Sequence, residues 1–140
     1  GRKLRRDGGA GMNALIVDLK KVCNLANTSS FDLIECSASL MDGIQTLELA
    51  TDIMLQADEI DALSAATPYL NIVASVISGA FIMKAVVNGA IAGDENTENM
   101  ISLCTYHLKS IMPLAKNSIE FLRSPNKLVF DFPREQLADL

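Results

Sequence analysis

TPYLNIVASVISGAFIMKAVV, residues Thr67 to Val87, lies within the longest stretch of the sequence with almost no charge. It opens with Thr67 and Pro68, a hydroxyl that can cap a helix and a residue whose missing N–H costs nothing in the first turn. The only charge in the whole stretch is on Lys84. The pattern predicts a helix that is apolar on nearly every side, and such a helix must be surrounded by protein or by lipid.

Several polar residues argue against a membrane span. Lys84 lies deep in the run, and uncharged polar side chains recur at Asn71, Ser75, Ser78 and Asn88. The flanking segments are acidic and give no excess of Lys or Arg on one side of the run. We therefore predict no membrane span and a helix that is covered by protein.

The outer face of this helix must be covered by something beyond the neighbouring helices of the chain. Another domain or a second copy of the chain could provide that cover. Small residues would let a second backbone approach closely, and these are Ala74, Ser75, Ser78, Gly79 and Ala80. We predict a docking helix, most simply in a two-fold dimer with Gly79 and Ser75 at the contact.

Composition and charge limit the classes of function. The chain has 140 residues, enough for one domain with its own core, and few aromatic residues, a composition that favours helix. The formal net charge of −5 argues against a nucleic-acid partner, because phosphate contacts need clustered Lys and Arg. The three cysteines form no C-x-x-C pair, and no apolar segment follows the basic start. We expect reduced thiols and a cytoplasmic protein.

Four segments have the residue spacing of helices: 10–27, 31–57, 67–92 and 97–123. In the second segment an apolar residue recurs every seven positions, which is the pattern of a helix seam. Gly43 within that seam fits a close helix contact better than a free surface. Asp58 follows this segment and can cap a short helical turn.

Short connections join these segments, so the sequence predicts an all-α fold: an antiparallel up-down four-helix bundle in a single domain over residues 1–140. Pro113 should kink the last helix near Lys109, because proline removes an N–H and its ring collides with the preceding turn. The predicted core comprises Leu15, Leu19, Leu33, Leu40, Ile44, Leu47, Ile72, Val76, Ile101, Leu108 and Ile111.

No arrangement of residues predicts catalysis or a metal site. His107 is the only histidine and can share a helix face with Cys104, but two ligands do not make a zinc site. Residues 8–11 lack the lysine and the preceding strand of a phosphate-binding loop, so we expect a helix interruption there. Cys23, Cys36 and Cys104 fall on or beside apolar stripes and are predicted to be buried, unreactive thiols.

Two parts of the sequence resemble one enzyme family. ATPYLNIVASVISGAFIMKAVV (residues 66–87) and, after an acidic gap, NMISLCTYHLKSIMPLAKNSIEFLRSP (residues 99–125) are similar to the C-terminal helical extension of a subset of acyl-CoA dehydrogenases. The likeness lies in the Ala-Thr-Pro-Tyr-Leu opening, the spacing of Tyr106 and Pro113, and the Leu-x-Ser-Pro ending. GRKLRRDGGAGMNAL (residues 1–15) independently resembles the segment where that family leaves its catalytic core.

The resemblance implies a division of the chain and a chemistry that lies elsewhere. Residues 1–30 would end the last helical region of the dehydrogenase core, residues 31–125 would form the extension bundle, and residues 126–140 a tail. In the family a glutamate removes the α-proton of the acyl-CoA and FAD accepts the hydride. The resemblance places that glutamate, the FAD and most of the acyl-CoA pocket outside this chain.

No catalytic, FAD-binding or metal-binding residue is therefore expected in this chain. One candidate lies in the basic cluster Arg2, Lys3, Arg5 and Arg6, which the resemblance would place near the CoA nucleotide. Arg2 is the residue that we single out for that contact.

Two functions remain open. The resemblance implies that the whole protein is an FAD-dependent acyl-CoA dehydrogenase, in which this domain supplies packing and homo-oligomer surface against the remainder of the core. By itself the domain would be inactive. The alternative is a stand-alone helical interaction or dimerisation module, with the apolar third helix as its partner surface.

Overall fold

The computed structural model describes residues 4, 6–29, 32–93 and 95–123, and all regular structure in these ranges is helical. The predicted all-α class is therefore confirmed for this part of the chain. Arg2 and the predicted tail over residues 126–140 lie outside the described residues. The helices are α2 (Ala10–Asn27), α3 (Ile34–Gln56), α4 (Glu59–Ser64), α5 (Ala66–Ala92), α6 (Thr97–Tyr106), the π-helix η1 (His107–Ile111), α7 (Met112–Asn117) and α8 (Ile119–Arg123).

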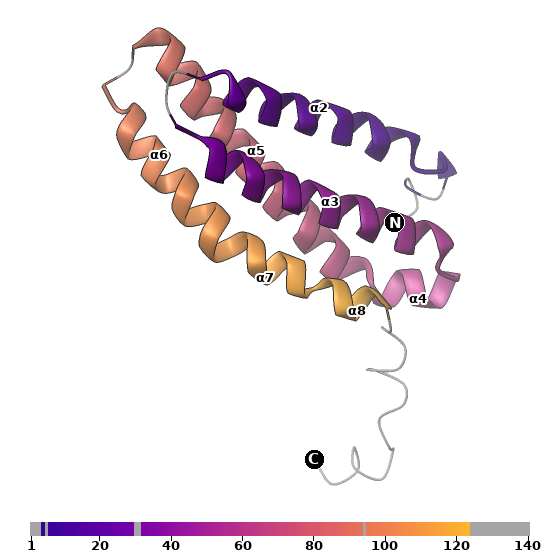
Figure 1. Cartoon of the computed structure of the whole chain (residues 1–140). Coiled ribbons are helices and arrows are strands. Elements are labelled where there is room, and N and C mark those ends of the chain that lie inside the picture. The colour runs from indigo at the N-terminus through magenta and orange to yellow at the C-terminus, as the bar shows by residue number, and fades with distance from the viewer. Residues whose placement is uncertain (1–3, 5, 30–31, 94, 124–140) are drawn as a thin grey trace, which may run out of the picture.

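The helices α3 and α5 form the centre of the molecule (Figure 1). They pack against each other, and each contacts α2 on one side and the segment from α6 to α8 on the other. The short helix α4 connects α3 to α5 at one end (Figure 1). α5 therefore has neighbours on three sides and leaves its fourth side outward.

The core lies between α3 and α5 and the two flanking segments. Its fully buried side chains include Leu40, Ile44 and Leu47 from α3, and Ile72 and Val76 from α5. Burying each of these side chains stabilises the fold by roughly 1.5–3 kcal/mol. Eight of the eleven predicted core residues are buried, while Leu15 and Ile101 are half-buried and pack against the core.

The prediction that Ile111 belongs to the core is wrong, because Ile111 is 37% exposed. The cause is the π-helical turn η1, in which the Met112 N–H bonds the His107 carbonyl five residues back. A π turn contains one more residue than an α turn, so the buried face passes from Leu108 to Met112 instead of to Ile111.

Pro113 accounts for the position of this π turn. In a regular α-helix its N–H would bond the Lys109 carbonyl, but proline has no N–H and its ring collides with that carbonyl. The wider turn over His107–Ile111 relieves this conflict. The structure thus has a π turn at the place where the sequence predicted a kink.

The start of α2 explains the glycine-rich residues 8–11. Gly8 and Gly9 have φ of 65° and 85°, the left-handed conformation that favours glycine. The Asp7 carboxylate accepts hydrogen bonds from the Gly9 N–H (2.9 Å) and the Gly11 N–H (3.2 Å). The predicted helix interruption is confirmed.

The start of α5 differs from the prediction. Asp58 caps α4 as expected and accepts a hydrogen bond from the Asp61 N–H at 2.8 Å. However, α4 leads almost directly into α5, whose N-cap is Ala65 in a helical conformation. The Thr67 side chain therefore does not cap the helix, because the helix has already begun at Ala66.

Two glycines mark close contacts with the last helical segment. A Cβ atom on Gly43 would lie 2.6 Å from the Met112 Sδ, and one on Gly79 would lie 3.3 Å from His107 and Leu108 atoms. The close contact predicted at Gly43 is confirmed.

The prediction that Gly79 lies at an outer two-fold contact is wrong, because Gly79 faces the core on the same side of α5 as Ile72 and Val76. Ala80 is buried as well.

We expect Gly43→Leu to lower the free energy of unfolding by about 1–3 kcal/mol, because the added side chain would occupy the space of Met112. Ala38→Leu adds a side chain to an exposed position of the same helix and should change stability by less than about 0.5 kcal/mol. Urea unfolding followed by circular dichroism measures both. Equal stability of the two variants would contradict the contact.

Candidate functional site

The outward side of α5 carries an apolar stripe. Its residues follow one another at intervals of four and three and are all exposed: Leu70, Ala74, Ile77, Phe81, Lys84, Asn88 and Ile91. We call this set the α5 stripe. Phe81, near its middle, is 76% exposed. Solvent exposure of so many apolar side chains along one helix is typical of a contact surface.

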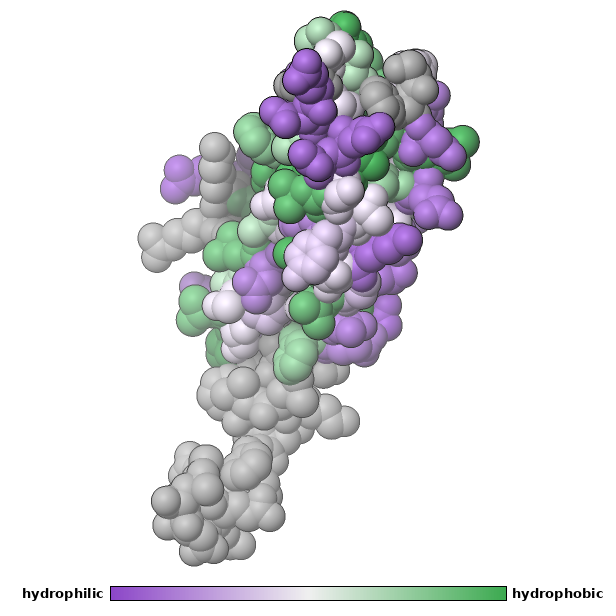
Figure 2. Space-filling model, turned by 90° about the vertical axis from the view of Figure 1, so that its left-hand side faces the viewer, coloured by the Kyte–Doolittle hydropathy of each residue, from purple (hydrophilic) through white to green (hydrophobic). Residues whose placement is uncertain are grey.

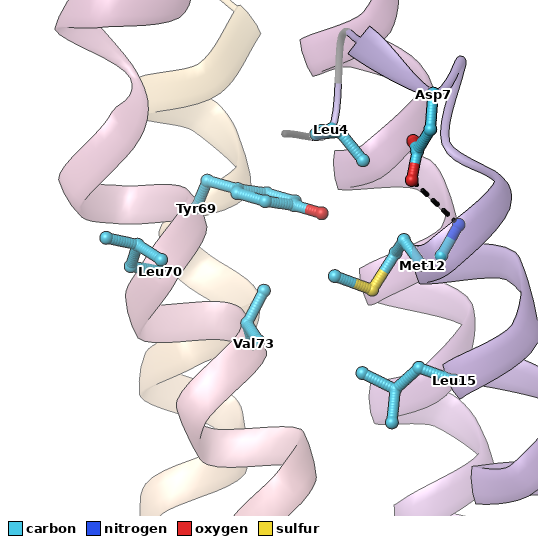
Figure 3. A pocket seen from close by; sticks show the side chains of 8 residues that line it. Leu4, Asp7, Met12, Leu15, Tyr69, Leu70 and Val73 are labelled. Atoms are coloured by element: carbon cyan, nitrogen blue, oxygen red, sulfur yellow. Dashed lines mark hydrogen bonds between the residues drawn. The ribbon is translucent and has the colours of Figure 1, made fainter. Parts of the chain in front are cut away.

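A cleft lies along one edge of the stripe, between the start of α2 and the start of α5 (Figure 3). We call it the α2–α5 cleft; its volume is about 300 Å³. In Figure 3 the side chain of Met12 points across it towards Val73, and the ring of Tyr69 extends into it from α5. Its lining consists of Leu4, Asp7, Gly11, Met12, Leu15, Tyr69, Leu70 and Val73.

The polar groups around this cleft already have partners. The Asp7 carboxylate bonds two backbone N–H groups, and the Tyr69 hydroxyl lies 2.9 Å from the Thr51 Oγ1 in the interior. Burial raises the pKa of Tyr69, so its hydroxyl remains protonated at neutral pH. What the cleft offers is therefore mainly apolar surface, suited to an apolar side chain or a small apolar molecule.

A second groove follows the opposite edge of the stripe, between α5 and α7. It also measures about 300 Å³, and it is lined by Asn71, Ala74, Ser75, Ile111, Leu114, Ala115 and Ser118. Leu114 and Ile111 are among the exposed large apolar residues. The side of the molecule seen in Figure 2 mixes apolar and polar groups, with hydrophilic side chains concentrated at the top and along the right-hand edge. The α5 stripe and its two grooves together form a mixed surface in which exposed apolar side chains outnumber polar ones.

The single histidine has a structural position. His107 is 7% exposed, and its Nε2 lies 3.0 Å from the Ser75 carbonyl oxygen, to which it donates a hydrogen bond. This bond connects the π turn to α5. Across residues 4, 6–29, 32–93 and 95–123, no group of three or more His, Cys, Asp or Glu side chains could hold a metal ion. His107 and Cys104 therefore have no third ligand in this part of the chain.

The three thiols are buried, as predicted, and carry no disulfide. The Cys36 Sγ lies 3.4 Å from the Thr105 Oγ1, and the Cys23 thiol contacts the Ser37 carbonyl oxygen at 3.8 Å. Burial raises the pKa of Cys104 from 9.0 to about 12, with a smaller contribution from the neighbouring Cys36, and burial also raises the pKa of Cys23. Cys104 and Cys23 are therefore protonated at neutral pH and poor nucleophiles.

Within the described residues, α5 is the one helix long and apolar enough to cross a membrane by length and composition. It also supplies Tyr69, Ile72, Val76, Gly79, Ala80, Met83, Val86 and Val87 to the buried part of the molecule. The core helix of a soluble protein can be equally long and apolar. The absence of a membrane span therefore stays a prediction.

The sequence predicted an exposed face on α5 but placed Gly79 and Ala80 there. In the structure the outward face instead follows the intervals of four and three from Leu70 to Ile91. The α2–α5 cleft was not predicted, because Leu4 and Tyr69 are far apart in sequence and no local pattern joins them. The candidate Arg2 lies outside the described residues.

No protein-family model, no curated protein and no solved structure matches this chain.

We expect Tyr69→Phe to lower the free energy of unfolding by about 1–3 kcal/mol, because it leaves the buried Thr51 hydroxyl without its partner. The double variant Thr51→Val/Tyr69→Phe removes both groups and should recover most of that loss. Chemical unfolding of wild type, both single variants and the double variant gives the coupling between the two residues. Additive losses would contradict a direct bond.

We expect the wild-type chain to lose stability between pH 9 and pH 12. The folded state holds the Cys104 proton up to a pKa of about 12, whereas the unfolded state releases it near 9.0, so the stabilisation is complete below pH 9 and disappears as the pH rises. The full contribution is on the order of 4 kcal/mol.

In Cys104→Ala this loss with pH should be shallower, although the variant is less stable at neutral pH because of its cavity. Urea unfolding of both proteins at several alkaline pH values measures the two slopes. Parallel slopes for wild type and variant would contradict the role of Cys104.

Proposed function

We propose that this chain is a helical docking and oligomerisation module that performs no chemistry itself, and that it forms the C-terminal helical domain of an FAD-dependent acyl-CoA dehydrogenase. The observation behind the docking role is the α5 stripe, where apolar side chains such as Phe81 and Leu70 face outward from the longest helix. Apolar surface of this extent favours association with another protein surface.

The proposed topology is an antiparallel up-down four-helix bundle. Its four members are α2, α3, α5 and the broken segment from α6 to α8. Short connections and contacts between consecutive members support this arrangement. In such a bundle α5 presents only one side to a partner, which fits a docking surface on a single helix.

The assignment to the acyl-CoA dehydrogenases rests on the sequence resemblance over residues 1–15, 66–87 and 99–125. In that enzyme the partners of this domain are the remainder of the dehydrogenase core and other copies of the subunit. FAD and the acyl-CoA bind to the core, outside this chain, apart from a contact of Arg2 near the CoA nucleotide. We further propose a cytoplasmic location, no membrane span and no nucleic-acid partner.

One observation favours the alternative of a stand-alone interaction module. The helices from α2 to α8 bury a contiguous cluster of apolar side chains among themselves, including Leu40, Ile72 and Leu108. A chain with its own core can fold without a larger enzyme. Its partner surface would be the same α5 stripe.

Purification of the product of the complete reading frame separates these two functions. We expect a yellow protein with one FAD per chain that oxidises an acyl-CoA thioester in the presence of an artificial electron acceptor. Residues 1–140 alone should bind no FAD and show no such turnover. A complete product without flavin and without turnover would contradict the enzyme assignment and leave the docking module.

A further inference from the structure

We propose that Cys36 and Cys104 form a reversible disulfide when the protein meets a peroxide, with Cys36 as the thiol that reacts first and Cys104 as the thiol that completes the bond. Cys36 belongs to α3 and Cys104 to α6, and the clefts beside Cys36 contain no residue of α5. The oxidation of this pair is therefore independent of the proposed docking function.

The two thiols are neighbours in space although they are far apart in sequence. Cys36 lies in the first turn of α3 and Cys104 in the last turn of α6. The Cys36 Sγ lies 3.4 Å from the Oγ1 of Thr105, the residue that follows Cys104. The side chains of Cys36 and Cys104 also interact through a hydrogen bond. The third thiol, Cys23, lies on α2 and contacts the Ser37 carbonyl oxygen instead.

Cys36 is the member of the pair that a small molecule can reach. Two clefts between α3 and the segment from α6 to η1 are both lined by Cys36 and Thr105. The larger cleft measures about 270 Å³ and also includes Ile34 and Ile101. Hydrogen peroxide is little larger than a water molecule, so it fits this cleft. Cys36 is 8% exposed, whereas Cys104 is fully buried, so a peroxide meets Cys36 first.

The first step oxidises Cys36. Its thiolate sulfur attacks one oxygen of the peroxide, the O–O bond breaks, and the leaving hydroxide takes up the proton that the thiol has released and becomes water. Cys36 is then a sulfenic acid. A thiolate has no proton, so the Thr105 hydroxyl is the donor in its contact with the reacting sulfur and stabilises the negative charge there.

The second step joins the two sulfurs. The Cys104 sulfur attacks the Cys36 sulfur, the S–O bond breaks, and the hydroxyl leaves as water with the Cys104 proton. Burial raises the pKa of Cys104, and the neighbouring Cys36 raises it further. The second contribution disappears once Cys36 is a neutral sulfenic acid, and the closeness of the two side chains replaces a chance encounter. In total, one peroxide converts two thiols into a disulfide and two water molecules.

The disulfide links two helices that pack mainly against other helices. α6 packs mainly against α5, and α3 packs mainly against α2 and α5. The bond closes a long loop, from residue 36 to residue 104, and so restricts the unfolded chain. We expect the oxidised chain to unfold about 10 °C above the reduced chain. A thiol reductant such as dithiothreitol should remove this shift, as in the transient disulfides by which proteins of reducing compartments sense oxidants.

Mass spectrometry of oxidised wild type tests the pair. We expect hydrogen peroxide at neutral pH to lower the mass of the monomer by about 2 Da and to leave Cys23 as the free thiol. Cleavage after glutamate releases Cys36 in residues 36–48 and Cys104 in residues 99–120, and Cys23 lies in neither peptide. The expected result is a cross-link between these two peptides that dithiothreitol removes.

Three variants assign the roles of the thiols. Cys36→Ala should keep both of its remaining thiols. Cys104→Ala should stop at the sulfenic acid on Cys36, which the trapping reagent dimedone labels. Cys23→Ala is the matched control: it removes a buried thiol outside the pair and should form the cross-link at the wild-type rate. Circular dichroism verifies that the variants are folded, and the cross-link in wild type decides the pairing without them.

Three results would overturn the proposal. A wild-type chain that keeps all its thiols while free glutathione in the same solution is oxidised would show that peroxide does not reach Cys36. Dimedone labelling of Cys36 in wild type without a cross-link would show that Cys104 does not reach the oxidised sulfur. A disulfide that includes Cys23 or joins two chains would assign the reaction to other thiols. The flavin measurement on the complete product tests the proposed function separately from all three.

Discussion

α5 is apolar around most of its circumference, but the described residues pack against only part of it. α3 and the two flanking segments cover the side that carries Ile72, Val76 and Met83. The opposite side, with Leu70, Ile77 and Phe81, has no cover among the described residues. Apolar surface in water is unfavourable by roughly 25 cal/mol for each Å². The described residues therefore bury one side of α5 and leave apolar side chains exposed on the other.

The way in which the last segment covers α5 follows from Pro113. The π turn that this residue induces brings His107, Leu108 and Met112 onto the core side. There the His107 ring bonds the Ser75 carbonyl, and Met112 occupies the space that Gly43 leaves open on α3. One proline thus determines both which residues are buried and how closely α3 and α7 approach. The only histidine of the chain is used in this packing.

Sequence patterns predicted the helices well, because each helix is specified locally. The range 10–27 agrees with α2, and the predicted core residues Leu33, Leu40 and Leu47, seven positions apart, are all buried. The prediction of which residues face outward was wrong where the local pattern is compatible with more than one orientation of the helix. A helix that is apolar on all sides does not reveal which side is inward, and Gly79 was therefore placed on the outer face.

The parts that could not be predicted depend on contacts between distant segments. Ile111 fits a seven-residue period until the π turn shifts the register by one residue, and the period gives no sign of that shift. The α2–α5 cleft needs Leu4 beside Tyr69, which only the packing of α2 against α5 brings about. The function was proposed from a resemblance of sequence and from the exposed apolar side chains of α5.

We expect the α5 stripe to be covered in the assembled protein, and hydroxyl-radical footprinting at increasing protein concentration measures this cover. Oxidation is read residue by residue by mass spectrometry. Phe81 and Leu70 should become protected as concentration rises, while Leu25, an exposed residue of α2, should keep a constant rate of oxidation. If the rate at Phe81 is as independent of concentration as the rate at Leu25, the stripe stays exposed and carries no contact between copies.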